Sequence, residues 1–340
     1  MTAQGRWKRR PEGANWGEFG ADDQLGRLNL IGQDRVLAGA AEIKEGRNFC
    51  LSLPLDYPGE SVLASYRSPP QLRPTLRNGR ACFHYDFSAE EPGFDDIVCD
   101  DAVCLCTQYS THWDGLAHIG EPFDVDGDGN RKIVYYNGFR AGIDVVEPGG
   151  VCTMSSTALG IEHMAQHGVQ GRGVLVDLAK RFGRVRHLVG YDDLCHCLEQ
   201  DGIAVAPGDI LCLHTGFSRL LLDMGRHPDG AVLASSCAAL DGCDRKLLNW
   251  ITDSGIAAIA ADNFAVEAQP PRIEARRGRS YVPLHEHCLF KLGMPLGELW
   301  HFEELNGWLN AHSRHFFFLT APPLRLPGAM GSPITPIATV

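Results

Sequence analysis

The chain has 340 residues, of which 44% are hydrophobic and 21% charged, and its 42 acidic and 31 basic residues give a formal net charge of −11. These values are typical of a globular protein that is long enough to bury a substantial core. Because binding to a phosphate backbone requires a basic surface, the charge excludes nucleic acid as an expected partner.

The sequence also contains no segment that is expected to enter a membrane. No apolar run approaches the roughly 18 residues of a membrane span. The stretch MTAQGRWKRRPEGANWGEFG at the N-terminus lacks the apolar part of a secretory signal. We therefore expect a cytoplasmic protein with no membrane partner, whose twelve cysteines are free thiols rather than zinc ligands.

The first predicted elements are an extended arm and a helix. Residues 1–30 are rich in glycine, tryptophan and charge. In DRVLAGAAEIKEG, residues 34–46, the apolar positions have near-helical spacing and Gly46 is a stop signal. We expect an N-terminal arm and helix over residues 1–45 and a single catalytic domain over residues 46–340.

A loop and a strand are predicted next. The stretch SYRSPPQLRPTLRNG, residues 65–79, contains three prolines and ends in Asn-Gly, which predicts a loop that closes in a hairpin turn. The residues that follow at 102–109, AVCLCTQY, have the composition of a strand.

Strands and helices then alternate through the rest of the chain. Strands are predicted for GVLVDLA from Gly173, GDILCLHTG from Gly208, IAAIAADNFAVE from Ile256 and HFFFLT from His315. Helices are predicted for YDDLCHCLEQDG from Tyr191 and CDRKLLNWITDSG from Cys243. This alternation predicts an α/β fold around a mixed, largely parallel sheet.

The stretch QYSTHWDGLAH, Gln108 to His118, carries the strongest chemical signal. On an extended strand alternate side chains share a face, which would align Gln108, His112 and Asp114. Gly115 then permits a turn that brings His118 back towards them. Imidazole nitrogen and carboxylate oxygen are suitable ligands for a divalent metal, although a hydrogen-bonded core network would use the same residues.

A second group of polar residues occurs in PLHEHCLFKLGMPLGELW, which contains His285, His287 and Glu298. A glutamate after an apolar run needs a partner if it is buried, or it lies at the surface where a helix begins. Both interpretations of Glu298 are open from these residues alone.

One loop imitates a calcium site. In DVDGDGN, Asp124 to Asn130, the aspartates occupy the first, third and fifth positions of an EF-hand loop. Position twelve is Tyr135 rather than glutamate, so an acidic turn is favoured. Binding of a loosely held calcium ion stays open as an alternative. Neither a G-x-S-x-G elbow nor a G-x-G-x-x-G loop occurs, which argues against a serine nucleophile and a dinucleotide cofactor.

QYSTHWDGLAH resembles the HxGTHxDxPxH signature of the cyclase family, which includes kynurenine formamidases and isatin hydrolases. NWGEFGADDQLGRLNLI, HEHCLFKLGMPLGELW and FFFLTAPPLRLPGAMGSP resemble segments of the longer members of that family. The resemblance implies a metal-dependent hydrolase with a swivelling β/β/α fold that forms a homodimer or homotetramer.

The family motif also implies roles for individual residues. His118 would be the proton carrier, and the implied metal ligands are His112, Asp114, Gln108, His285 and Glu298. Gln108 stands where the family has its first histidine, so the number of metals is open, as is the choice of His285 over His287. Ligands of nitrogen and oxygen suit Mn²⁺ or Zn²⁺. Trp113 and Trp300 are expected to line an aromatic substrate pocket.

We therefore expect an amidohydrolase that cleaves a C–N bond of a small-molecule cyclic amide or N-acyl aromatic amine with metal-activated water. One alternative is a metal-dependent cyclase or lyase that uses the same site for proton transfer. The other is a catalytically inactive binding homologue.

Overall fold

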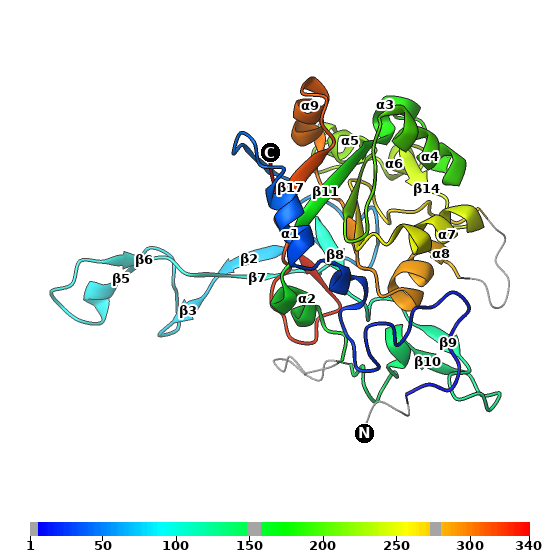
Figure 1. Cartoon of the computed structure of the whole chain (residues 1–340). Coiled ribbons are helices and arrows are strands. Elements are labelled where there is room, and N and C mark those ends of the chain that lie inside the picture. The colour runs from blue at the N-terminus through cyan, green and yellow to red at the C-terminus, as the bar shows by residue number, and fades with distance from the viewer. Residues whose placement is uncertain (1–5, 148–157, 273–279) are drawn as a thin grey trace.

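The computed structural model describes residues 6–147, 158–272 and 280–340, and a nine-stranded mixed sheet forms the centre of this part of the chain (Figure 1). The strand order is β1-β19-β17-β11-β13-β15-β16-β8-β18. The central neighbours β11, β13, β15 and β16 are parallel, and the outer pairings on both sides are antiparallel. The expected α/β fold with a mixed sheet and a parallel centre is confirmed.

The strands of this sheet are short, and several match the predicted segments. Their bounds are β1 Asn48–Cys50, β8 His112–Asp114, β11 Gln170–Asp177, β13 Ile210–His214, β15 Ala258–Ala261, β16 Leu296–Glu298, β17 Phe316–Thr320, β18 Gly331–Pro333 and β19 Ile337–Thr339. Smaller two-stranded sheets pair β9 (Glu121–Phe123) with β10 (Lys132–Val134) and β12 (His187–Val189) with β14 (Ala238–Leu240).

Helices cover both faces of the central sheet because its strands are apolar on both sides. Val174 and Val176 of β11 belong to one core cluster, with residues of α4 and α7, whereas Leu175 belongs to the other, with residues of α9. This is the two-residue alternation of a strand that is buried on both faces. The α-helices are α1 Gln33–Ala40, α2 Ile161–His167, α3 Leu178–Phe182, α4 Tyr191–Gln200, α5 Phe217–Asp223, α6 Gly230–Ala234, α7 Arg245–Ser254, α8 Pro283–His285 and α9 Glu303–Ala311.

Short helical turns complete the described elements. Three are 3₁₀-helical, η2 (Gly26–Leu30), η3 (Phe87–Ala89) and η4 (Tyr136–Gly138), and η5 (Glu286–Lys291) is a π-helix directly after α8. None of the described helices has the length and apolar character that crossing a membrane would require.

The N-terminal segment lies against the body of the protein. The Trp16 side chain is fully buried, and its indole N–H donates to the carbonyl of Phe290 at 2.8 Å. The buried Arg27 guanidinium donates to the carbonyls of Ile251 and Thr252, at 2.7 and 2.6 Å, near the end of α7. These contacts anchor the segment to the face of the sheet that α7 covers.

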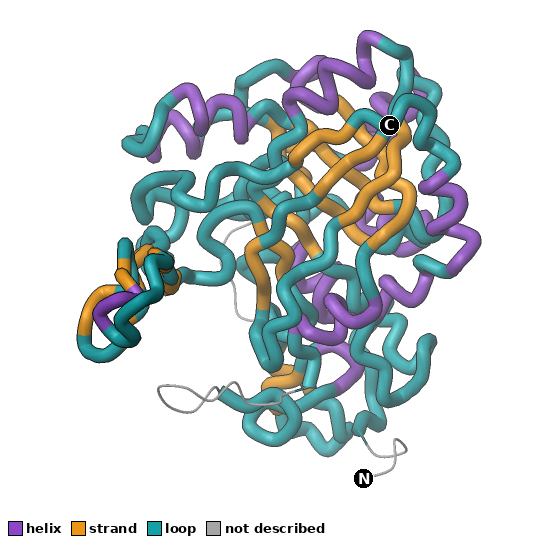
Figure 2. Tube along the Cα trace, turned by 90° about the vertical axis from the view of Figure 1, so that its left-hand side faces the viewer, coloured by secondary structure: helices purple, strands orange, loops and turns teal. Residues whose placement is uncertain are grey.

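A hairpin arm, residues 71–104, projects away from the body (Figures 1 and 2). It consists of three small antiparallel pairs: β2 (Gln71–Pro74) with β7 (Asp101–Cys104), β3 (Leu76–Arg77) with β4 (Arg80–Ala81), and β5 (Tyr85–Asp86) with β6 (Ile97–Val98). The Asn78-Gly79 turn forms as predicted, with positive φ at both residues. The predicted strand at 102–109 is only partly correct, because it ends at Cys104 and lies in the arm rather than in the central sheet.

Candidate metal centre

The motif residues are held by β8, which lies between β16 and β18. In this register His112 is opposite Glu298, and Asp114 is opposite Leu296. Because side chains alternate along a strand, His112 and Asp114 face one side of the sheet together with Glu298, and Trp113 faces the other. Two neighbouring strands therefore bring three ligand-type side chains to one point.

The expected aromatic pocket at Trp113 and Trp300 is a prediction that the structure corrects. Both side chains are fully buried in the core on the far side of β8, where their rings meet edge to face at 5.0 Å. Gly297 permits this packing, since a Cβ there would lie 2.6 Å from the Trp300 indole nitrogen. The indole N–H groups donate to the carbonyls of Ala321 and His112, so neither ring faces a ligand cavity.

The three ligand-type side chains form a compact buried cluster. His112 Nε2 lies 3.6 Å from Asp114 Oδ1 and 3.8 Å from Glu298 Oε2. One ligand atom from each residue lies within 4.8 Å of the others. Relative exposures are 0% for His112 and Asp114 and 3% for Glu298.

These residues leave buried polar atoms without hydrogen-bond partners. The atoms are His112 Nε2, both carboxylate oxygens of Asp114, and Glu298 Oε2. His112 Nδ1–H donates to the carbonyl of Ser110 at 2.7 Å, so Nε2 is the ring atom available to a metal. Burial lowers the pKa of this ring, but the carboxylates of Asp114 and Glu298 outweigh it and raise that pKa above its usual value. A nitrogen and carboxylate oxygens, all buried and unpaired, fit a divalent cation, and three protein ligands are typical of a catalytic metal site.

His285 extends the cluster on the side of Glu298. Its Nε2 lies 3.1 Å from Glu298 Oε1 and 3.8 Å from Asp114 Oδ2. Its Nδ1–H donates to Glu267 at 2.7 Å, and the backbone N–H groups of Leu284 and His285 donate to the same carboxylate. Burial lowers the pKa of His285, but the carboxylates of Glu267 and Glu298 outweigh it and raise that pKa to about 10.

Glu267 positions the His285 ring, a role that the sequence did not reveal. Of the two candidate histidines, the structure places His285 rather than His287 beside the cluster. A carboxylate that accepts from the rear nitrogen of a histidine fixes the orientation of that ring, a common arrangement behind metal ligands. His287 points elsewhere, with Nε2 at 2.9 Å from Thr252 Oγ1, and burial lowers its pKa to about 4.

His118 and Gln108 lie at the edge of the cluster. His118 Nε2 is 3.6 Å from Asp114 Oδ1, and its Nδ1 is 3.3 Å from the Gln108 amide nitrogen. The hydroxyl of Thr107 donates to the Gln108 amide oxygen at 2.8 Å. Gln108 therefore contacts His118, and its oxygen is already engaged, which separates it from the three clustered ligand-type residues.

Burial and charge act against each other throughout the cluster. Burial raises the pKa of Asp114, but the imidazoles of His118 and His112 outweigh it and hold that pKa below its usual value. In Glu298 the hydrogen bond from His285 likewise outweighs burial and lowers the pKa. For His118 burial dominates and lowers the pKa. Near pH 7 both carboxylates are ionised and His118 is neutral, as a cation site and a proton acceptor require.

A cavity of about 620 Å³ opens beside the cluster. His118, His285 and Glu298 form one wall, and most of the remaining wall is apolar or aromatic, including Phe264 and Tyr281. A substrate in this cavity would contact the proton carrier and the metal-ligand candidates at the same time.

The aspartate-rich loop at Asp124–Asn130 joins β9 to β10, and protein cations occupy its carboxylates. Asp126 pairs with Lys132 and with Arg140, the latter at 2.7 Å, and Asp124 accepts from Arg9 at 2.9 Å. These contacts agree with the acidic turn, which the sequence favours over a calcium-binding loop.

Comparisons with known proteins found matches over most of the chain. The family model named Cyclase matches residues 51–268. A solved structure described as a novel cyclase is 30% identical with a TM-score of 0.75, over 96% of this chain and 97% of that chain. Among curated protein sequences, none matches the chain significantly.

Two isatin hydrolases share the fold at lower identity. Isatin hydrolase A from Labrenzia aggregata, bound to benzyl benzoate, is 12% identical with a TM-score of 0.55, over 90% of this chain and 97% of its own. Isatin hydrolase A from Ralstonia solanacearum is 14% identical with a TM-score of 0.55, over 89% and 95%.

Proposed function

The chain belongs to the cyclase family, and from this premise we propose that it is a metal-dependent hydrolase that cleaves the C–N bond of a cyclic amide or an N-acyl aromatic amine. The observation that carries the proposal is the convergence of unpartnered buried atoms from His112, Asp114 and Glu298. Burial of unpaired charge is costly, and a cation that all three residues bind would offset that cost. The fold shared with two isatin hydrolases supports hydrolysis as the reaction class.

Mn²⁺ or Zn²⁺ held by His112, Asp114 and Glu298, with His285 beside them, would supply Lewis acidity that lowers the pKa of water from about 15.7 to about 7 and polarises a carbonyl. The remaining chemistry belongs to the side chains of the chain. His118 lines the cavity and is neutral, so it can accept the proton of the attacking water and return it to the departing nitrogen. The His118 Nε2 atom lies 3.6 Å from the Asp114 carboxylate, so this imidazole is next to a candidate metal ligand.

The first experiment measures metal content and turnover together. Purified protein is analysed by mass spectrometry for bound Mn and Zn, then assayed against lactams, imides and N-formyl anilines with either ion. We expect a stoichiometric metal and hydrolysis of at least one class. Protein that stays metal-free when supplied with both ions would instead indicate an inactive binding homologue.

Products formed in ¹⁸O-water separate hydrolysis from the cyclase or lyase alternative. Hydrolysis places the label in the new carboxylate, and proton transfer alone does not. His118→Ala is expected to keep the metal and lose turnover, whereas the control His167→Ala, at an exposed helix end, is expected to keep both.

A further inference from the structure

Arg67 is a permanently charged residue that lines the cavity beside the cluster. Of the described residues that line the cavity, Arg67 is the only lysine or arginine, and it shares this lining with His118, His285 and Glu298. One guanidinium nitrogen donates to the backbone carbonyl of Gln108 at 2.8 Å. Arg67 is therefore tethered next to the motif that carries the ligand candidates.

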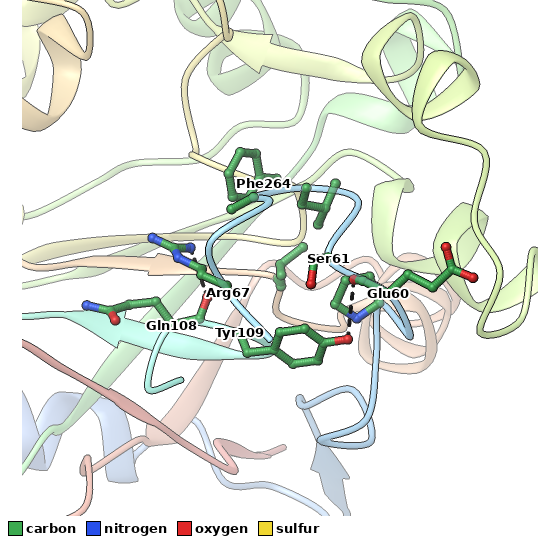
Figure 3. Close-up of a pocket in the computed structure, with 10 residues that line it drawn as sticks. Glu60, Ser61, Arg67, Gln108, Tyr109 and Phe264 are labelled. Carbon is green, nitrogen blue, oxygen red and sulfur yellow. Dashed lines mark hydrogen bonds between the residues drawn. The ribbon is translucent and has the colours of Figure 1, made fainter. Parts of the chain in front are cut away.

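No carboxylate neutralises this arginine within the described part of the chain, where its charge has no ion-pair partner at 4.0 Å or less. Figure 3 shows Arg67 between Gln108 and Phe264, with the Glu60 side chain pointing away from it. The Glu60 carboxylate instead contacts His227 Nδ1 at 2.7 Å. Guanidinium has five donors in a planar fork, and only one of these is used by the Gln108 carbonyl.

The rest of the cavity suits an apolar or aromatic body. Its walls include Leu63, Ile119, Phe264, Tyr281 and Val282. Apolar walls with a few convergent polar groups are typical of small-molecule sites. A ligand that fills this cavity would contact both Arg67 and His118.

The missing ion-pair partner of Arg67 favours an anionic ligand. Asp114 and Glu298 would neutralise a divalent cation, so neither carboxylate would be available to pair with Arg67. The charge of Arg67 would then be left over. We propose that Arg67 is a specificity-determining residue that binds a carboxylate of the substrate, so that the preferred substrates are aromatic amides that carry an acidic group.

This inference rests on the proposed function, and two substrates that differ in one carboxylate test it. N-formylanthranilate and formanilide are compared in wild type, Arg67→Gln and Arg67→Lys. We expect Arg67→Gln to lower kcat/KM for the acid by about 10- to 100-fold, the value of a charge-assisted hydrogen bond, and to change the neutral amide less than about twofold. Arg67→Lys should lie between the two. The control Arg245→Gln removes an exposed arginine at the start of α7.

Binding provides a readout that does not need turnover. Calorimetry with benzoate and benzamide on zinc-loaded protein should show that Arg67→Gln weakens benzoate at least about tenfold at unchanged zinc content, with benzamide unaffected. Equal losses for acid and amide, or no loss for either, would overturn the role of Arg67. If neither amide is hydrolysed but benzoate still depends on Arg67, the proposed reaction fails and the anion site stands.

Discussion

Two buried histidines of this protein lie between pairs of carboxylates, and they differ in what surrounds them. His285 lies between Glu267 and Glu298 beside the candidate metal centre. His214, at the carboxyl end of β13, lies between Asp177 at 2.9 Å and Glu303 at 3.2 Å. Hydrogen bonds with the carboxylates overcome the effect of burial in both cases and raise each pKa to about 10.

The difference lies in the hydrogen bonds that remain unmade. Around His214 the second oxygen of Asp177 accepts from Asn306 and Asn310, at 2.7 and 3.1 Å. Around His285 the neighbouring Asp114 and Glu298 leave buried oxygens unpaired. A fully paired network holds elements of the fold together, whereas a converging set of unpaired atoms indicates a ligand.

The largest expected effect comes from the same substitution made in both clusters. Asp114→Asn removes a ligand charge, and we expect it to lower kcat by about 10³-fold or more and to reduce the bound metal measured by mass spectrometry. Asp177→Asn should leave metal content and kcat close to wild type. Equal loss of metal in both variants would contradict the distinction between the clusters.

The free energy of unfolding should depend on the His214 cluster, although metal binding should not. His214→Gln leaves Asp177 without its nearest cationic partner, and we expect the free energy of unfolding to fall by about 2–3 kcal/mol, measured by denaturation in urea. A larger loss is not expected, because the Glu303 side chain is half-exposed and water screens its interaction with His214. A change below about 0.5 kcal/mol, as is usual for surface positions, would show that this cluster is not structural.

Glu267→Gln tests the residue behind His285. The amide keeps the shape but weakens the hold on the ring, and loss of such a partner typically costs 10- to 100-fold in metal affinity. Competition with a chromogenic chelator measures this, and Glu303→Gln is the matched control behind His214. Unchanged affinity in Glu267→Gln would remove its positioning role.

The pH dependence of stability separates the two clusters further. Folding raises the pKa of His214 from 6.5 to about 10, so its contribution is complete below about pH 6.5 and is lost as the pH rises towards 10. We expect the difference in unfolding free energy between wild type and His214→Gln to shrink over that range. A difference that grows with pH would contradict the charged state of His214.

The smallest expected effect is a gain. Gln108→His restores the imidazole that the family motif has at this position, and we expect zinc affinity to rise by less than about tenfold, because imidazole is the better ligand. Space is limited, since a Cβ on Gly331 would already lie 2.6 Å from the Gln108 amide nitrogen. Chelator competition measures the change, and weaker binding would indicate that the ring displaces His118.

Local patterns in the sequence predicted much of the scaffold. The buried strands β11, β13 and β15 and the helices α4 and α7 follow from apolar runs and periodicity. Strand alternation also places His112 and Asp114 together, and it explains why Trp113 cannot share their pocket: adjacent residues on β8 face opposite sides. That signal was present in the sequence.

Contacts between distant segments could not be predicted in this way. Glu267 and His285 are 18 positions apart, and no local pattern marks Glu267 as the partner. Arg67 precedes a proline-rich stretch that predicts only a loop, and its place at the cavity depends on the hairpin arm returning to Gln108. Such pairings arise from the packing of the sheet, which one sequence does not encode locally.

The hydrogen bonds that Glu267 accepts from α8 have a consequence for the rate of metal loading. One carboxylate receives two backbone N–H groups and the rear nitrogen of His285, so the ring is aimed at the site as soon as the chain has folded. An arriving ion would find this ring already in place, without a backbone rearrangement. The rate of loading would then depend on the loss of the His285 Nε2 proton rather than on movement of the chain, and apo and loaded crystals should superimpose closely around α8.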